Sequence, residues 1–320
     1  MTNKQIYASL CERENLPLFM QPWWMDAVCA GKHWDVLLYV DTDGRVQAAM
    51  PYLFRKRGIL RYVIMPQLTQ TGGVWLASSC VEDSDKRILI VDFFVKQLTA
   101  LRLHYYYQQF PVGSPLPELL RGRGFEVRKR ITYCIYDITD MDRVVASFSV
   151  NKRRQLKKAQ TLFPDMTLDP QTFYRFHKQC LGQKRAVISY SWQLFEALYR
   201  AADNRNQGQL VALRDAENRL LAAAFVVWDR ERMYYLLPAL SPDATHTGAG
   251  ARLVLECIRL ARQKGIPVFD FEGSIVPSIA NHYRQFGSVS AVYYSVEKIY
   301  KRWFRLVLRY NRFRNRKTGI

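Results

Sequence analysis

The sequence lacks the features that mark zinc-binding, disulfide-bonded and membrane-spanning proteins. Its six cysteines are scattered singly, with no C-x-x-C pair, so neither a zinc site nor a disulfide framework is indicated. No apolar run approaches the roughly 18–20 residues that a membrane-spanning helix needs. The first ten residues, MTNKQIYASL, have no long apolar core, which argues against a secretory signal peptide. We therefore expect a cytoplasmic protein that holds no metal.

Acidic residues are scarce beside basic ones. The chain has 28 Asp and Glu against 47 Lys and Arg, which gives a formal net charge of +19. The basic residues gather in two clusters, N-K-R-R-Q-L-K-K at 151–158 and a second one at 301–317. A charge of this size favours polyanionic partners such as tRNA, nucleotides or anionic lipid. Two solvated helix faces would explain the clusters equally well.

The chain repeats part of itself at a long spacing. D-T-D-G-R-V-Q-A-A-M begins at Asp41 and D-A-E-N-R-L-L-A-A-A begins at Asp215, an offset of 215 − 41 = 174 residues. I-M-P-Q-L at 64–68 meets L-L-P-A-L at 236–240, an offset of 236 − 64 = 172. Solenoid repeats are only about 20–50 residues long, so this spacing indicates two copies of a whole domain. We place the copies at 1–138 and 139–298, followed by a basic aromatic tail at 299–320.

Each copy has the same predicted order of elements. An acidic turn joins two strands, a third strand ends near a proline, a helix follows, and further strands complete the copy. The expected ranges are 34–40, 45–53, 60–65, 84–100, 103–110 and 125–138, then 209–213, 220–228, 233–237, 248–264, 267–273 and 289–298. The strand after each helix must cross over to lie parallel to its neighbour. The expected fold class is therefore α+β, with a mixed, mostly antiparallel sheet flanked by helices.

The copies differ after the matched prolines. The second has T-H-T-G-A-G-A at 245–251, where the first has S-S-C-V-E-D-S-D at 78–85. Backbone N–H groups at a helix start form an anion site when glycines leave them uncovered. We therefore predict that Thr245, His246, Gly248, Gly250 and Ala251 form an anion-binding loop, although a plain tight turn would give the same pattern.

Asp270 and Glu272 point to one face of a strand that should be buried. Buried carboxylates are costly unless they are paired or used. Either one could act as a general base for an amine, and an ion pair with an arginine such as Arg284 is the alternative. Tyr235 could protonate a leaving group, or could simply pack in the core.

Two short segments carry a resemblance to a known family. F-S-V-N-K-R-R-Q-L-K-K-A at 148–159 looks like the basic helix of FemAB-like transferases, and N-H-Y-R-Q-F-G at 281–287 resembles their F-K-x-x-F-G segment. These proteins have two tandem domains of the acyl-CoA N-acyltransferase (GNAT) fold. The resemblance implies that Lys152, Arg153, Tyr283 and Arg284 bind substrate. Thr245 departs from the family's phosphate-loop pattern, which begins with Gln or Arg.

The resemblance implies transfer of an acyl or aminoacyl group from acyl-CoA or aminoacyl-tRNA to an amine. An ordinary acyl-CoA-dependent N-acyltransferase with a small or lipid-linked acceptor is the alternative enzyme. A non-catalytic protein that binds nucleic acid or a membrane surface is the third hypothesis. It would use the basic charge alone.

The tail carries a further alternative. Ile299, Trp303, Val307 and Tyr310 fall on one helical stripe among basic residues. Such a helix can lie in the interface of an anionic membrane, which would place residues 299–317 at the inner membrane face. It can also dock its apolar stripe on the body of the protein.

Overall fold

The computed structural model describes residues 1–29, 34–183, 187–273 and 277–308. The chain divides into two compact units. Unit 1 consists of Met1–Arg130 and the segment that begins at Val292, and unit 2 is Ile131–Ala291. The domain boundaries predicted from the sequence, after residues 138 and 298, stay predictions. Within the described ranges, no helix has the length and hydrophobicity to cross a bilayer.

Unit 1 begins with an antiparallel meander. Strands β1 (Trp34–Val40), β2 (Val46–Arg57) and β3 (Leu60–Ile64) pair in that order, and β4 (Trp75–Leu76) also pairs with β2. Strand β5 (Tyr105–Phe110) is parallel to β3, and β12 (Val289–Ile299) is antiparallel to β5. The helices are α1 (Asn3–Arg13), α2 (Pro22–Val28), α3 (Ser78–Val81), α4 (Ser84–Ala100) and α5 (Leu116–Arg121).

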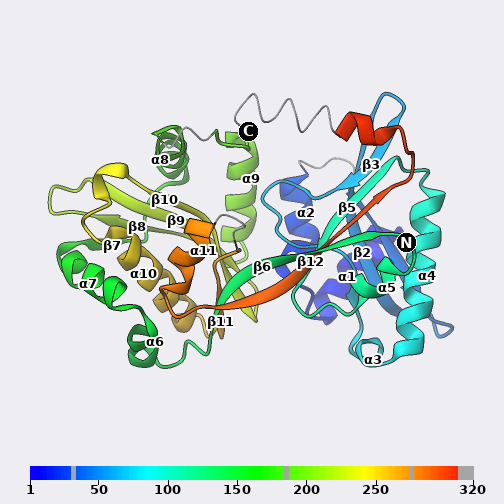
Figure 1. Cartoon of the computed structure of the whole chain (residues 1–320), viewed down its shortest axis with the longest axis horizontal. Coiled ribbons are helices and arrows are strands. Elements are labelled where there is room, and N and C mark those ends of the chain that lie inside the picture. The colour runs from blue at the N-terminus through cyan, green and yellow to red at the C-terminus, as the bar shows by residue number, and fades with distance from the viewer. Residues whose placement is uncertain (30–33, 184–186, 274–276, 309–320) are drawn as a thin grey trace. The chain divides into compact units, whose positions relative to one another are not determined.

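Unit 2 has the same strand topology (Figure 1). Its meander is β8 (Gly208–Arg214), β9 (Leu220–Trp228) and β10 (Arg232–Leu240), with β7 (Phe163–Asp165) beside β8. Strand β11 (Val268–Asp270) is parallel to β10, and β6 (Glu126–Tyr136) is antiparallel to β11. The helices are α6 (Met141–Ser147), α7 (Val150–Lys158), α8 (Pro170–Gln183), α9 (Trp192–Asp203), α10 (Ala249–Gln263) and α11 (Pro277–Arg284).

The acidic turns of the two meanders are equivalent. In unit 1 the Asp41 carboxylate accepts a hydrogen bond from the Arg45 N–H at 2.8 Å. In unit 2 the Asp215 carboxylate accepts one from the Arg219 N–H at 2.8 Å. The two aspartates begin hairpins of the same topology, as the sequence repeat predicts.

The last strand of each unit comes from the other half of the sequence. Strand β5 pairs with β12, which lies near the end of the chain, and β11 pairs with β6, which lies before its middle. The sheet of each unit therefore ends in a strand that the other half of the sequence supplies. A mostly antiparallel sheet with one parallel pair per unit confirms the expected α+β class.

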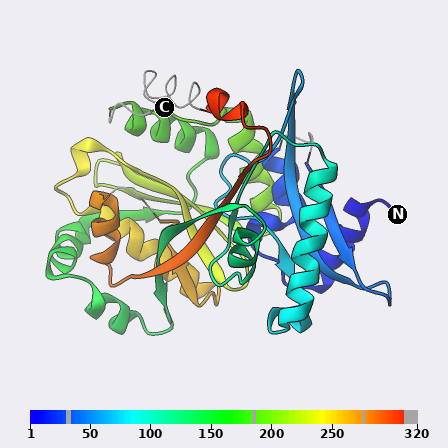
Figure 2. The same ribbon diagram turned by 45° about the vertical axis from the view of Figure 1, so that its right-hand side comes forward.

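Helix α4 lies along the strands of unit 1 (Figure 2). Its bounds are those predicted, but its buried face consists of Ile90, Val91, Phe94 and Leu98. Ile88, at the spacing of one turn before Val91, is not part of this face, because 39% of that residue is exposed. Asp83 caps the helix by accepting a hydrogen bond from the Lys86 N–H.

Helix α10 fills the core of unit 2 with its apolar stripe. Glu256 lies on this helix as well, and only 6% of it is exposed. Arg252 and Arg259 form ion pairs with its carboxylate at 2.5 and 2.7 Å. The paired charges explain how a carboxylate can lie at this depth.

Strand β11 is shorter than the predicted strand at 267–273, since it ends at Asp270. Glu272 lies beyond it with φ of +60°, so the alternation of faces does not extend to this residue. Pro238 lies inside β10, whereas the sequence suggested a strand that ends before it.

Candidate functional site

The two glycines at the start of α10 have different surroundings. Gly248 has φ of +81°, and a Cβ there would lie 2.1 Å from the Gln155 carbonyl oxygen of α7. Glycine is therefore required at 248 so that α7 can approach the turn. A Cβ on Gly250 would instead lie 3.4 Å from the nearest atom of Leu240, an ordinary contact. Only the second position has room for a side chain.

The rest of the predicted anion-binding loop at 245–251, the donor loop, is a turn closed by hydrogen bonds. The Thr245 hydroxyl donates to the Pro242 carbonyl, so it closes a turn of its own. The Thr247 hydroxyl accepts from the Ala249 N–H at 3.1 Å and caps the helix start. Ala251 is buried, and His246 is exposed. Of this loop, His246 and Gly250 are best placed to meet a ligand.

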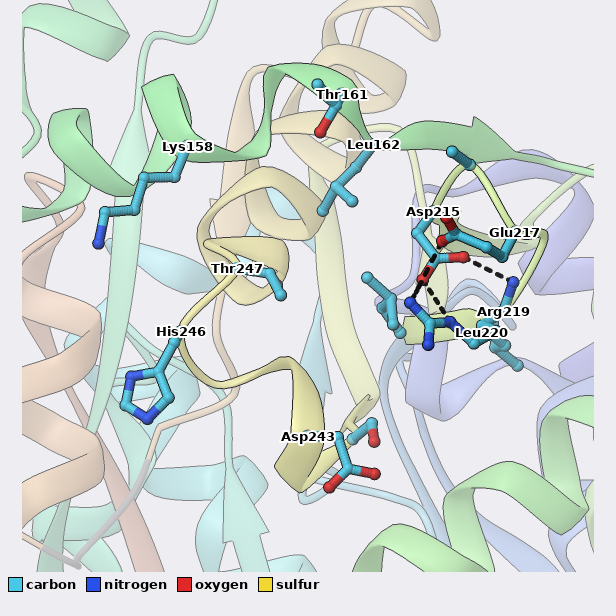
Figure 3. A pocket seen from close by; sticks show the side chains of 13 residues that line it. Lys158, Thr161, Leu162, Asp215, Glu217, Arg219, Leu220, Asp243, His246 and Thr247 are labelled. Carbon is cyan, nitrogen blue, oxygen red and sulfur yellow. Dashed lines mark hydrogen bonds and ion pairs between the residues drawn. The ribbon is translucent and has the colours of Figure 1, made fainter.

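A pocket of about 620 Å³ opens beside the turn (Figure 3). Its walls are the end of α7, the acidic turn after β8 and the segment that leads into α10. The charged and ring-bearing side chains on these walls are Lys158, Asp215, Glu217, Arg219, Asp243 and His246. The pocket contacts the predicted donor loop through His246 and Thr247.

The charges in this pocket are partly compensated. Arg219 forms ion pairs with Asp215 at 2.7 Å and with Glu217 at 3.2 Å. Lys158 makes no ion pair with any residue that the structure describes. Lys158 is therefore the cation best placed to meet an anionic group in the pocket.

Asp270 is a buried structural carboxylate, with 2% of it exposed. It forms an ion pair with Arg232 at 2.7 Å and accepts hydrogen bonds from the Thr132 hydroxyl and the Glu272 N–H. Arg232 also contacts the Cys134 sulfur at 3.0 Å. These contacts occupy both carboxylate oxygens of Asp270, as expected for a structural group. The predicted partner, Arg284, is not among its contacts.

Glu272 is half-buried at the carboxyl end of β11. Burial, followed by repulsion from Asp270, raises the pKa of its carboxyl well above the ordinary value of 4.5. A general base works best with a pKa near the working pH. Glu272 is thus better suited than Asp270 to accept the proton of an amine.

Tyr283 of α11 lies close to these acids. The Tyr283 ring stacks on Phe271 with 4.5 Å between centroids. Burial, then the nearby Glu272 and Asp270, raise the pKa of Tyr283 to about 12. Tyr283 therefore keeps its proton at neutral pH. The Arg284 guanidinium donates to the Tyr133 hydroxyl at 3.0 Å and is otherwise exposed.

Tyr235 lies in the core beside this cluster of polar groups. It is 6% exposed and packs in the core against Phe269 and Phe271. Burial raises the pKa of its hydroxyl well above 10. The core interpretation, which the sequence left open, fits this position better than the proton-donor interpretation.

Lys152 of α7 is a buried cation, with 3% of it exposed. Its ammonium contacts His282 Nδ1 at 3.2 Å and Gln155 Oε1 at 3.4 Å, and lies 4.7 Å from the Phe286 ring centre. Burial lowers the pKa of Lys152 to about 8.

Arg153, the next residue of α7, faces the protein. Its guanidinium donates to the carbonyls of Ala146 and Phe148 at 2.8 and 2.5 Å. These bonds hold the chain where α6 ends, so the contacts of Arg153 are structural.

A comparison with protein-family models matches residues 146–284 to the acetyltransferase (GNAT) domain. This segment of the chain therefore resembles a GNAT domain. The matched range lies within unit 2 and contains the glycine turn, the residues that line the pocket, and both acids at the end of β11. No curated protein matches the sequence significantly.

Solved structures extend the GNAT likeness to almost the whole chain. FemX has a TM-score of 0.71 at 14% identity, covering 96% of this chain and 98% of that one. A tandem GNAT protein from the clavulanic acid biosynthesis pathway has a TM-score of 0.51 at 12% identity, with 92% and 93% covered. The C-terminal domain of a putative lysylphosphatidylglycerol synthetase from Agrobacterium fabrum has 0.52 at 13%, with 82% and 83% covered. The predicted fold of two tandem GNAT-like domains is confirmed.

Sequence reasoning missed several residues of this GNAT domain. Arg232 occupies the site that was assigned to Arg284, and Lys158 lines the pocket. In the parallel register of β10 and β11, Tyr234 is opposite Asp270, so Arg232 is the diagonal neighbour on the same face. That register was the signal that could have identified Arg232. Among the described residues, no three His, Cys, Asp or Glu side chains form a group that could hold a metal ion.

Proposed function

We propose that the GNAT domain transfers an acyl or aminoacyl group from an activated donor to an amine. The observation that carries this proposal is Glu272, a half-buried carboxyl with a raised pKa at the end of β11. It lies within the segment that matches the GNAT domain model.

Glu272 would act as the general base. An amine is mostly protonated at neutral pH, and its lone pair must be released before it can attack a carbonyl. The attack forms a C–N bond and breaks the C–O bond of an aminoacyl ester, or the C–S bond of a thioester. The proton taken from the amine goes to Glu272. Tyr283, which keeps its own proton, would donate it to the leaving oxygen or sulfur.

The activated donor would lie against the pocket beside the glycine turn. Lys158 supplies a cation for a phosphate, and Gly250 leaves room for close approach to the start of α10. Lys152, Arg153, Tyr283 and Arg284 were predicted to bind substrate. Arg153 is the least available of the four, because its guanidinium donates to the carbonyls of Ala146 and Phe148.

Aminoacyl-tRNA is the donor that we favour over coenzyme A. Thr245 replaces the Gln or Arg of the usual phosphate loop, and its hydroxyl is bonded to Pro242. The face of Gly248 is filled by α7, so it cannot also receive a pyrophosphate. The similarity in fold to FemX supports the same choice.

Radiolabelled aminoacyl-tRNA and acetyl-CoA, each offered with a panel of primary amines, would test the donor. We expect transfer of the aminoacyl label, and tRNA binding that weakens steeply with salt. Transfer from acetyl-CoA alone would favour the ordinary N-acyltransferase, which the size of the pocket also allows. No transfer from either donor, together with no donor binding, would contradict the proposal.

A further inference from the structure

A surface of unit 1 combines positive charge with exposed apolar side chains. It consists of the tip of the β2–β3 hairpin, residues 55–61, and the helical turn at 301–306. We call it the basic apolar surface. The proposed transfer site lies in unit 2, so the two can be tested independently.

The two segments of this surface lie side by side. At the base of the hairpin, the Arg61 N–H donates to His104 Nδ1 at 3.3 Å. The His104 ring packs edge-on against Trp303 at 5.4 Å between centroids. Phe304 is 4% exposed and packs on His104 and Tyr105. Both views show the helical turn beside the hairpin (Figures 1 and 2).

The docking of Phe304 orients the rest of the helical turn. With Phe304 buried, its neighbours Lys301, Arg302, Trp303, Arg305 and Leu306 are exposed. Leu306 is 66% exposed and Trp303 is 46% exposed. Phe304, and not the predicted stripe through Ile299, Trp303 and Val307, is the most deeply buried part of this turn. Tyr310 lies outside the described residues.

The β2–β3 hairpin also combines an exposed apolar side chain with basic residues. Ile59 at its tip is 79% exposed, and it is surrounded in sequence by Arg55, Lys56, Arg57 and Arg61. The two segments thus carry 4 + 3 = 7 basic residues, and neither contains an acid. None of these seven side chains forms an ion pair within the described part of the chain.

We propose that the basic apolar surface binds the headgroup region of an anionic lipid bilayer. The seven charges would face the lipid phosphates, while Ile59, Trp303 and Leu306 would insert among the upper acyl chains. A nucleic acid would account for the charges. It would offer no apolar layer for an isoleucine at a hairpin tip, so lipid fits the whole surface better.

Co-sedimentation of the full chain with vesicles of phosphatidylglycerol and phosphatidylcholine tests the proposal. We expect binding to the anionic vesicles and not to pure phosphatidylcholine. Arg55→Gln with Arg57→Gln should weaken binding roughly 25-fold, at roughly fivefold per charge. Ile59→Ser and Leu306→Ser should each weaken it about tenfold. All four side chains are exposed, and thermal melts should confirm that the variants are folded.

Matched controls come from α4 of the same unit. Leu89→Ser removes an apolar residue that is 57% exposed, and Lys96→Gln removes an exposed charge. Both should bind vesicles as the parent does. The proposal is overturned if Ile59→Ser and Leu306→Ser bind vesicles normally, or if the controls weaken binding as much. It is also overturned if the arginine variants lose tRNA binding while vesicle binding is unchanged.

Discussion

At the scale of single residues, Glu272 and Asp270 are neighbours in sequence with different environments. Asp270 is held by Arg232, Thr132 and a backbone N–H, while Glu272 has a raised pKa. Two carboxyls whose environments separate them in this way suit two roles, one of positioning and one of proton transfer. Two substitutions can distinguish those roles.

Glu272→Gln should lower the rate of transfer by about 10²–10⁴-fold, because the general base is lost while the shape is kept. The rate of the parent should rise with pH through the raised pKa of Glu272, and the variant should lose this dependence. An effect smaller than about threefold on the identified reaction would leave Glu272 as a structural residue.

The free energy of unfolding should also depend on pH through the raised pKa of Glu272. A carboxyl whose pKa is raised on folding holds its proton more tightly in the folded state. Its contribution is therefore lost as pH rises from the unfolded value, near 4.5, through the folded value. Urea unfolding of Glu272→Gln should show a smaller fall in stability over this window.

Asp270→Asn should instead destabilise the fold by about 3 kcal/mol, since it leaves the partly buried Arg232 without its counter-charge. Asp215→Asn is the matched control, because it alters an ion pair in which the arginine side chain is 71% exposed. Urea unfolding should show a clear loss for Asp270→Asn and little change for the control. Equal losses would contradict the assignment of Asp270 as a buried structural group.

Lys152→Met should stabilise the protein near pH 7 by on the order of 1–2 kcal/mol, because a buried charge is removed. A lysine whose pKa falls from 10.5 to about 8 binds fewer protons when folded. The parent should therefore gain stability as pH rises from 8 to 10.5, and the advantage of the variant should shrink. A constant difference between pH 7 and 10.5 would contradict the lowered pKa.

At the scale of elements, the contact between α7 and the start of α10 separates the two glycines. Gly248→Ala should destabilise the protein, because the new Cβ would collide with the Gln155 carbonyl and the positive φ disfavours alanine. Gly250→Asp should fold and yet lose donor binding, since it places a carboxylate at the helix start. Thermal melts and donor titrations would measure both effects, and unchanged donor affinity in Gly250→Asp would move the donor site elsewhere.

The elements that the sequence predicted well are those with strong periodic patterns or clear turns. Strand β9 and helix α4 have the predicted bounds, and the acidic turns lie where Asp41 and Asp215 indicate. Helices α1, α2 and α6 were missed. Helix α1 has a capping box at Thr2, a signal that was available, although its apolar pattern is weak.

The candidate site was harder to predict because its geometry depends on contacts that are distant in sequence. Arg232 and Asp270 are 38 positions apart and meet only through the register of β10 and β11. The role of Gly248 depends on Gln155 of α7, which no pattern near the glycine could reveal. The acids and the glycine turn were found from sequence, but their partners required the fold.

At the scale of the whole molecule, the basic residues behind the formal charge of +19 fall into two groups. Some basic residues hold carbonyls or carboxylates, as Arg153 and Arg232 do. The seven on the basic apolar surface have no such partners among the described residues. The first group of basic residues stabilises the fold, and the second is available to bind a polyanion.

The exchange of last strands between the two halves has a consequence for the history of the gene. A fragment of residues 1–138 would keep β5 but lose β12, leaving β5 with an unpaired edge that invites aggregation. The second half alone would lack β6, the antiparallel neighbour of β11. Loss of either copy would therefore disable the survivor. After the two copies had come to share strands in this way, a deletion that removed one copy would have left the sheet of the other incomplete.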